Sequence, residues 1–116
     1  MIDITLRLNN IGCLLYIDAK GHSDSAVRGE DLICGAVSTL LRTVSRTLEN
    51  EPDVKLDGKI EERGDLQLGI TLLEESKENW LCGVSAFLVT GLKDLASEHP
   101  HFCRIQLERK NYDVLE

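Results

Sequence analysis

The chain has 116 residues, close to the commonest size of one domain, and we expect residues 1–116 to form a single domain with an ordinary core. The net charge is −7 and 42% of the residues are hydrophobic. This acidic balance argues against nucleic-acid binding, and it either suits a basic partner or serves only solubility. No apolar run is long enough to span a membrane, and no signal peptide is evident, so we expect a cytoplasmic protein without a membrane partner.

The first elements in chain order are two strands. Apolar and polar residues alternate over residues 2–8, the pattern of a strand with one wet face. Asn9 and Asn10 favour a tight hairpin, because Asn tolerates positive φ. A second strand is expected to end near residues 19–20, with an apolar face formed by Ile11, Cys13, Leu15 and Ile17.

Helical spacing of apolar residues begins near Asp31, which we expect to be the N-cap of a helix that ends near Asn50. Strands are predicted over residues 54–60 and 66–72, with a turn at Arg63 and Gly64 between them.

A second helix is predicted from Ser76 to the His99-Pro100 pair, and a last strand from about residue 102 to residue 109. The apolar stripe expected on this helix consists of Trp80, Leu81, Val84, Phe87, Leu88, Leu92 and Leu95. The order ββαββαβ predicts an α+β two-layer sandwich. We expect a mostly antiparallel five-stranded sheet with both helices on one face.

The four cysteines lie at positions 13, 34, 82 and 103 without a CxxC pair. In a cytoplasmic protein we expect thiols rather than disulfides. His101 and Cys103 are conceivable zinc ligands on one strand face, but their spacing fits no common zinc site, and we predict no metal and no cofactor. Cys82 lies opposite the apolar stripe, on a second face of small residues that is either exposed or a dimer contact.

Residues 20–30 fit neither the strand nor the helix period, and His22 and Cys34 flank this stretch. Cys34 sits at the edge of the apolar stripe near a helix N-terminus, so it is either a small half-buried residue or a nucleophile. The helix dipole contributes only about 0.3–1 kcal/mol, so a reactive Cys34 needs the imidazole of His22. Asp31 is either a helix cap or a residue that orients His22.

The residues around these positions carry a resemblance to a known family. Gly21-His22, followed after a short gap by Gly29-Glu30-Asp31-Leu32-Ile33-Cys34-Gly35-Ala36-Val37-Ser38, is similar to the signature of the ribosomal-processing cysteine proteases, the Prp family. The similarity covers nearly the whole chain. Ser23 and Gly35 stand where alanine is common in that family.

The resemblance implies a cysteine endopeptidase with a Cys/His dyad. Cys34 would be the nucleophile and His22 the general base and acid, with supporting roles for Gly21, Asp31 and Ser38. Members remove a short N-terminal extension from a basic large-subunit ribosomal protein, the twenty-seventh in the usual numbering, and they are typically homodimers. The stretch between His22 and Cys34 would then be a flap that assembles the dyad when the peptide binds. A non-catalytic ribosome-assembly factor that binds the same ribosomal protein is the alternative.

Overall fold

The computed structural model describes residues 1–21, 30–60 and 65–110. Its elements, in chain order, are β1 (Ile2–Asn9), β2 (Leu14–Lys20), α1 (Glu30–Glu49), β3 (Val54–Ile60), β4 (Leu66–Leu73), a 3-10 turn η1 (Glu75–Lys77), α2 (Glu78–Glu98) and β5 (Cys103–Lys110). The predicted order ββαββαβ is confirmed. None of the helices in these ranges combines the length and apolarity that crossing a bilayer would take.

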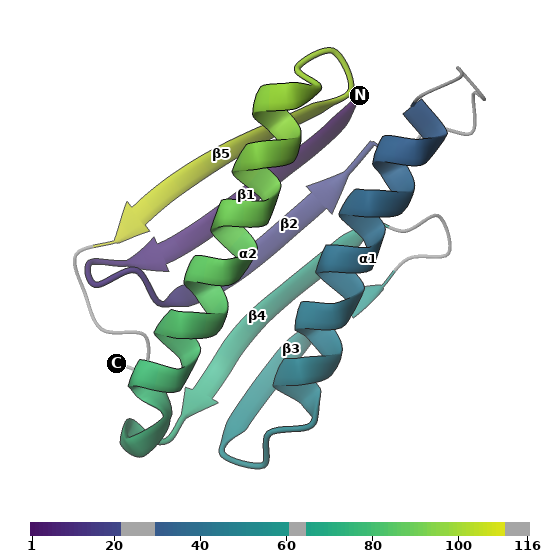
Figure 1. Cartoon of the computed structure of the whole chain (residues 1–116). Helices are drawn as coiled ribbons and strands as arrows, with labels where there is room; N and C mark the ends of the chain where they lie inside the picture. The colour runs from purple at the N-terminus through teal and green to yellow at the C-terminus, as the bar shows by residue number, and fades with distance from the viewer. Residues whose placement is uncertain (22–29, 61–64, 111–116) are drawn as a thin grey trace.

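The strands form one sheet in the order β3-β4-β2-β1-β5, and both helices lie on the same face of it (Figure 1). Neighbouring strands are antiparallel except β1 and β5, which run parallel. The predicted α+β sandwich with a mostly antiparallel sheet is therefore confirmed, in the form of a mixed sheet. The parallel pair arises because the chain crosses the whole sheet through α2 before it adds β5 at the β1 edge.

The hydrophobic core lies between the sheet and the helices. The inward residues of β1, which include Ile2, Ile4 and Leu6, are at most 1% exposed, as their alternation predicts. On the open face of the sheet, charged side chains pair across strands instead. Arg7 Nε lies 2.9 Å from Glu108 Oε1, and the Arg7 guanidinium lies over the Tyr16 ring. Several charged groups of the open face therefore have a partner on a neighbouring strand, whereas Asp18 Oδ1 is buried without a hydrogen-bond partner among the described residues.

The expected apolar face of the second strand is correct for Cys13 and Ile17, which are buried, and wrong for Ile11 and Leu15. Leu14 pairs with Leu8 and Tyr16 with Arg7, so Leu15 is an extra residue in the β1–β2 ladder. Such a bulge reverses the side-chain alternation, and the buried residues become Cys13, Leu14, Ile17 and Ala19. Ile11 lies in the turn and is 55% exposed.

The β1–β2 turn is held by Asn9, whose side-chain oxygen accepts hydrogen bonds from the backbone N–H groups of Ile11 and Cys13. This turn rests on the first half of α2. The Leu14 N–H donates to the buried hydroxyl of Ser85 on α2, at 2.8 Å, and that hydroxyl donates in turn to the carbonyl of Leu81. A polar residue on α2 is therefore buried because it satisfies the backbone at the start of β2.

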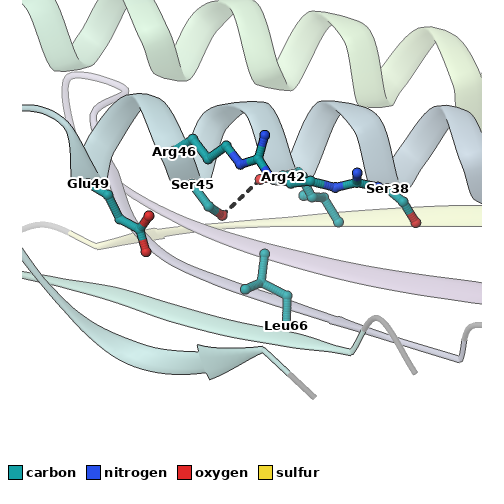
Figure 2. Close-up of a pocket in the computed structure, with 7 residues that line it drawn as sticks. Ser38, Arg42, Ser45, Arg46, Glu49 and Leu66 are labelled. Atoms are coloured by element: carbon teal, nitrogen blue, oxygen red, sulfur yellow. Dashed lines mark hydrogen bonds between the residues drawn. The ribbon is translucent and has the colours of Figure 1, made fainter. Parts of the chain in front are cut away.

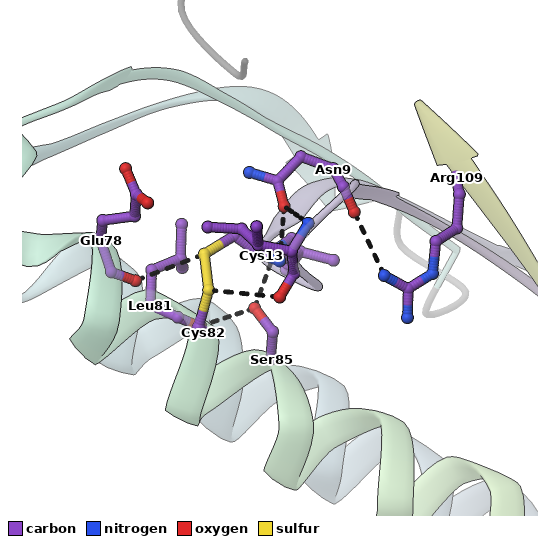
Figure 3. The surroundings of a disulfide bond; sticks show 9 residues. Asn9, Cys13, Glu78, Leu81, Cys82, Ser85 and Arg109 are labelled. Atoms are coloured by element: carbon purple, nitrogen blue, oxygen red, sulfur yellow. Dashed lines mark hydrogen bonds between the residues drawn. A yellow bond between two sulfur atoms is a disulfide. The ribbon is translucent and has the colours of Figure 1, made fainter. Parts of the chain in front are cut away.

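The expectation of four thiols is also wrong, because Cys13 and Cys82 form a disulfide with their Cα atoms 4.3 Å apart (Figure 3). The turn places Cys13 directly against α2, although the two residues are 69 positions apart in the sequence. Cys82 is thus half-buried beneath the turn. Cys34 and Cys103 are not disulfide-bonded.

The two helices approach one another closely where Gly91 meets Leu40. A Cβ atom at Gly91 of α2 would lie only 3.1 Å from Leu40 Cδ1 of α1, so a glycine allows this approach. The buried residues of α2 are Leu81, Ser85, Leu88 and Leu92. The expected stripe is therefore rotated: Trp80 and Val84 are only half-buried, and Phe87 is 71% exposed.

Candidate functional site

The candidate site lies at the end of the sheet where β2 stops and α1 begins (Figure 1). Gly21 follows β2 directly with a φ of +93°, a conformation that favours glycine. A Cβ atom on Gly21 would collide with the carbonyl oxygen of Met1, because the end of β2 lies beside the start of β1. Two independent constraints thus require glycine at this first position of the motif. His22, the next residue, lies outside the described residues.

Cys34 is the fifth residue of α1. It is half-buried and packs against the core, as expected for the edge of the apolar stripe. The orientation of this part of α1 follows from the residues beside Cys34. Ile33 and Val37 are buried under the helix, whereas Leu32 on the opposite side is 77% exposed. The sulfur therefore lies at the boundary between the core and the surface.

A second thiol lies in the same region. Cys103 at the start of β5 is buried, and it pairs in the sheet with Ile2. Burial is the main cause that raises the pKa of the Cys103 thiol, with smaller contributions from the charges of Asp3 and Cys34. The thiol of Cys103 therefore ionises at a higher pH than an ordinary thiol.

The remaining predicted residues are placed along α1. The helix begins at Glu30, so Asp31 lies inside the first turn and not at the N-cap position; its side chain is outside the described residues. Ser38 is half-buried one turn beyond Cys34 and lines a pocket. Gly35 is exposed, and no described atom lies within 4 Å of a Cβ built on it, so it serves no close backbone approach there.

The possible zinc pair is not on one strand face. His101 lies in the turn before β5 and is exposed, whereas Cys103 is buried. Over the ranges that the structure describes, no three His, Cys, Asp or Glu side chains are grouped as metal ligands would be. Gly21, Cys34 and Ser38 remain as the described candidate residues, all at or near the start of α1.

A comparison with models of protein families shows to which family this chain belongs. The family model described as Cysteine protease Prp matches residues 1–104. This chain belongs to the Prp family. The match spans the Gly21-His22 motif, the segment around Cys34 and every strand up to the start of β5. A comparison with curated proteins finds no significant match.

Solved structures share the Prp fold of this chain. SMU.848 from Streptococcus mutans is 24% identical with a TM-score of 0.77, over 95% of this chain and 96% of that one. The ribosomal processing protease Prp from S. aureus in complex with a substrate peptide is 16% identical, with a TM-score of 0.73 over 95% and 100% of the two chains. The same S. aureus protein with a covalently linked product peptide is 17% identical, with a TM-score of 0.72 over the same shares.

Proposed function

We propose that this chain is a single-domain cytoplasmic cysteine endopeptidase that removes the N-terminal extension of a basic large-subunit ribosomal protein, the twenty-seventh. The observation that carries the proposal is the family match over residues 1–104, which includes a half-buried Cys34 near the start of α1. The fold supports it further, because structures of the same fold have been solved with a substrate peptide and with a covalently linked product peptide.

The chemistry is acyl transfer to sulfur. The thiolate of Cys34 attacks the scissile carbonyl, and the proton taken up by His22 is passed to the leaving amine. The products of this step are a thioester on Cys34 and the released C-terminal fragment. Water then hydrolyses the thioester, with His22 as general base, and restores the thiol.

In this proposal, His22 supplies most of the activation of Cys34. The field of a helix N-terminus falls off within the first turn, and Cys34 is already the fifth residue of α1. An adjacent imidazolium is therefore the stronger means of stabilising the thiolate.

Three further residues support this dyad in the proposal. Gly21 directs the chain out of β2 toward His22, Asp31 either favours the start of α1 or orients His22, and Ser38 borders the peptide beyond Cys34. The loop from Gly21 to Glu30 acts as the flap that brings the imidazole to the sulfur when the peptide binds. It lies outside the described residues except at its ends.

The acidic net charge of −7 supports a basic protein as the partner. The decisive experiment is incubation of the purified chain with a peptide that spans the N-terminal extension of the ribosomal protein, followed by mass spectrometry. Cleavage should be abolished in Cys34→Ala and His22→Ala, while both variants still bind the peptide. Cys103→Ala is the matched control, because it also removes one thiol and should keep activity if it folds.

Two outcomes would count against this proposal. Cleavage that survives in Cys34→Ala would remove that sulfur from the mechanism. Binding of the peptide without any turnover by the wild-type chain would instead support the non-catalytic assembly factor.

We also propose that the chain forms a homodimer, with the outer surface of the two helices as the contact. An apolar groove of about 700 Å³ runs between α1 and α2, lined among others by Leu40, Trp80 and Val84, and the exposed Phe87 borders it. The open sheet face carries charged side chains, among them Arg7 and Glu108, so the helix face is the better surface for a second copy. Sedimentation analysis should show a dimer that dissociates in Phe87→Asp, and a wild-type monomer would contradict this.

A further inference from the structure

A second pocket lies on the side of α1 that faces away from α2, and it starts at Ser38. Its volume is about 290 Å³. Leu41 and Leu66 are buried and form its apolar base, and Glu49 lies at its far end (Figure 2). Because Ser38 lies one turn beyond Cys34, the pocket continues along the helix directly from the candidate nucleophile.

The pocket concentrates positive charge in an acidic protein. Arg42 and Arg46 are the only basic residues of α1, and both line it. Their spacing of four residues places them on the same side of the helix, and Figure 2 shows the Arg42 side chain extending toward Ser38. Among the residues that the structure describes, neither guanidinium forms an ion pair or a hydrogen bond.

We propose that this pocket is a subsite that binds an acidic side chain of the peptide substrate, with Arg42 and Arg46 as its specificity-determining residues. A guanidinium presents a planar fork of N–H donors that matches a carboxylate. The helix rises about 1.5 Å per residue, so Arg42 lies about 12 Å and Arg46 about 18 Å beyond Cys34 along the axis. An extended peptide rises about 3.3 Å per residue, which places the acidic residue roughly four to six positions from the scissile bond.

This inference rests on the proposed function for the identity of the ligand, but it makes a separate claim about binding. A purely structural role for the arginines is the competing explanation, since Arg46 lies in the last turn of α1, where a cation stabilises the helix. That role would change the free energy of unfolding and would leave the choice between acidic and neutral peptides unaltered. The test therefore measures peptide selectivity.

The experiment uses the full-length Cys34→Ala variant and fluorescent, Phe-containing synthetic peptides. Each peptide carries a single Glu, and a matched peptide carries Gln at the same position. Across the series this position moves from about three to about seven residues on either side of the expected scissile bond. Fluorescence anisotropy should show that Glu binds about two- to fivefold more tightly than Gln at one position, the upper part of the range for an exposed charge pair. Adding Arg42→Gln should remove this preference, and Arg42→Lys should keep part of it.

Lys93→Gln in the same background is the matched control, because it makes the same change of charge on the exposed surface of α2 and should keep the preference. The inference is overturned if no position prefers Glu, if no peptide binds, or if the preference survives in the Arg42→Gln/Arg46→Gln double variant. Displacement of the Glu peptide by an equal concentration of inorganic phosphate would overturn the assignment to a peptide carboxylate.

The same peptides given to the chain with Cys34 intact separate the two proposals. Cleavage without a Glu preference removes the subsite and leaves the endopeptidase. A Glu preference without cleavage removes the endopeptidase and leaves the subsite.

Discussion

The Cys13–Cys82 disulfide connects the β1–β2 turn to α2, and its removal is the strongest available perturbation of stability. The cross-link spans 69 residues. In the chain-entropy description, a closed loop of this length stabilises the folded state by about 4 kcal/mol, because it restricts the unfolded chain. For a chain of 116 residues this corresponds to a fall in Tm of about 15 °C.

The measurement compares urea unfolding of the wild-type chain with that of Cys13→Ala/Cys82→Ala, each with and without a thiol reductant. Reductant should destabilise the wild type toward the level of the double variant, and it should leave the double variant unchanged. The latter comparison is the control, since it isolates the cross-link from other effects of the reductant. Thiol titration of the unfolded, unreduced wild type should detect only Cys34 and Cys103.

The reasoning would be refuted if oxidised and reduced wild-type protein unfolded at the same urea concentration, or if titration found four thiols. Peptide cleavage provides a separate expectation. The turn that holds Cys13 lies at the opposite end of β2 from the start of α1 (Figure 1). Activity of the double variant should therefore be retained at temperatures where it is folded.

Three smaller predictions concern single residues. Gly21→Ala should lower the free energy of unfolding by about 1–3 kcal/mol, because its positive φ and the nearby Met1 carbonyl exclude a Cβ; unchanged urea unfolding would contradict this. Gly35→Ala should raise the free energy of unfolding by about 1 kcal/mol, because the helix position is exposed and no described atom lies within 4 Å of the new methyl group. A lower free energy of unfolding would contradict this. The pKa of Cys103 is raised in the folded chain, so the thiol of the unfolded chain ionises first as pH rises. The resulting stabilisation of the fold is complete below the ordinary thiol value of 9.0 and is lost as pH rises through and above that value. Unfolding free energies between about pH 8 and about pH 10.5 should thus fall more steeply in wild type than in Cys103→Val, and parallel profiles would refute the assignment.

The sequence predicts much of the candidate site because its signals are local. The Gly21-His22 pair and the segment around Cys34 are contiguous patterns, and the half-buried position of Cys34 follows from its angle on the helix relative to Ile33 and Val37. The proximity of Cys103 to Cys34 has no such signal. It arises only because β5 is added beside β1, which places two thiols from distant segments at the same end of the sheet.

The sequence alone determined the order of strands and helices, because the periods of 2 and 3.6 residues are properties of the local backbone. Only the tertiary structure decided how these elements meet. The bulge at Leu15 placed Leu14 in the core in its stead, and α2 packs with Ser85 against Leu14 so that Phe87 faces outward. The disulfide likewise depends on a 4.3 Å Cα separation between residues that packing alone brings together.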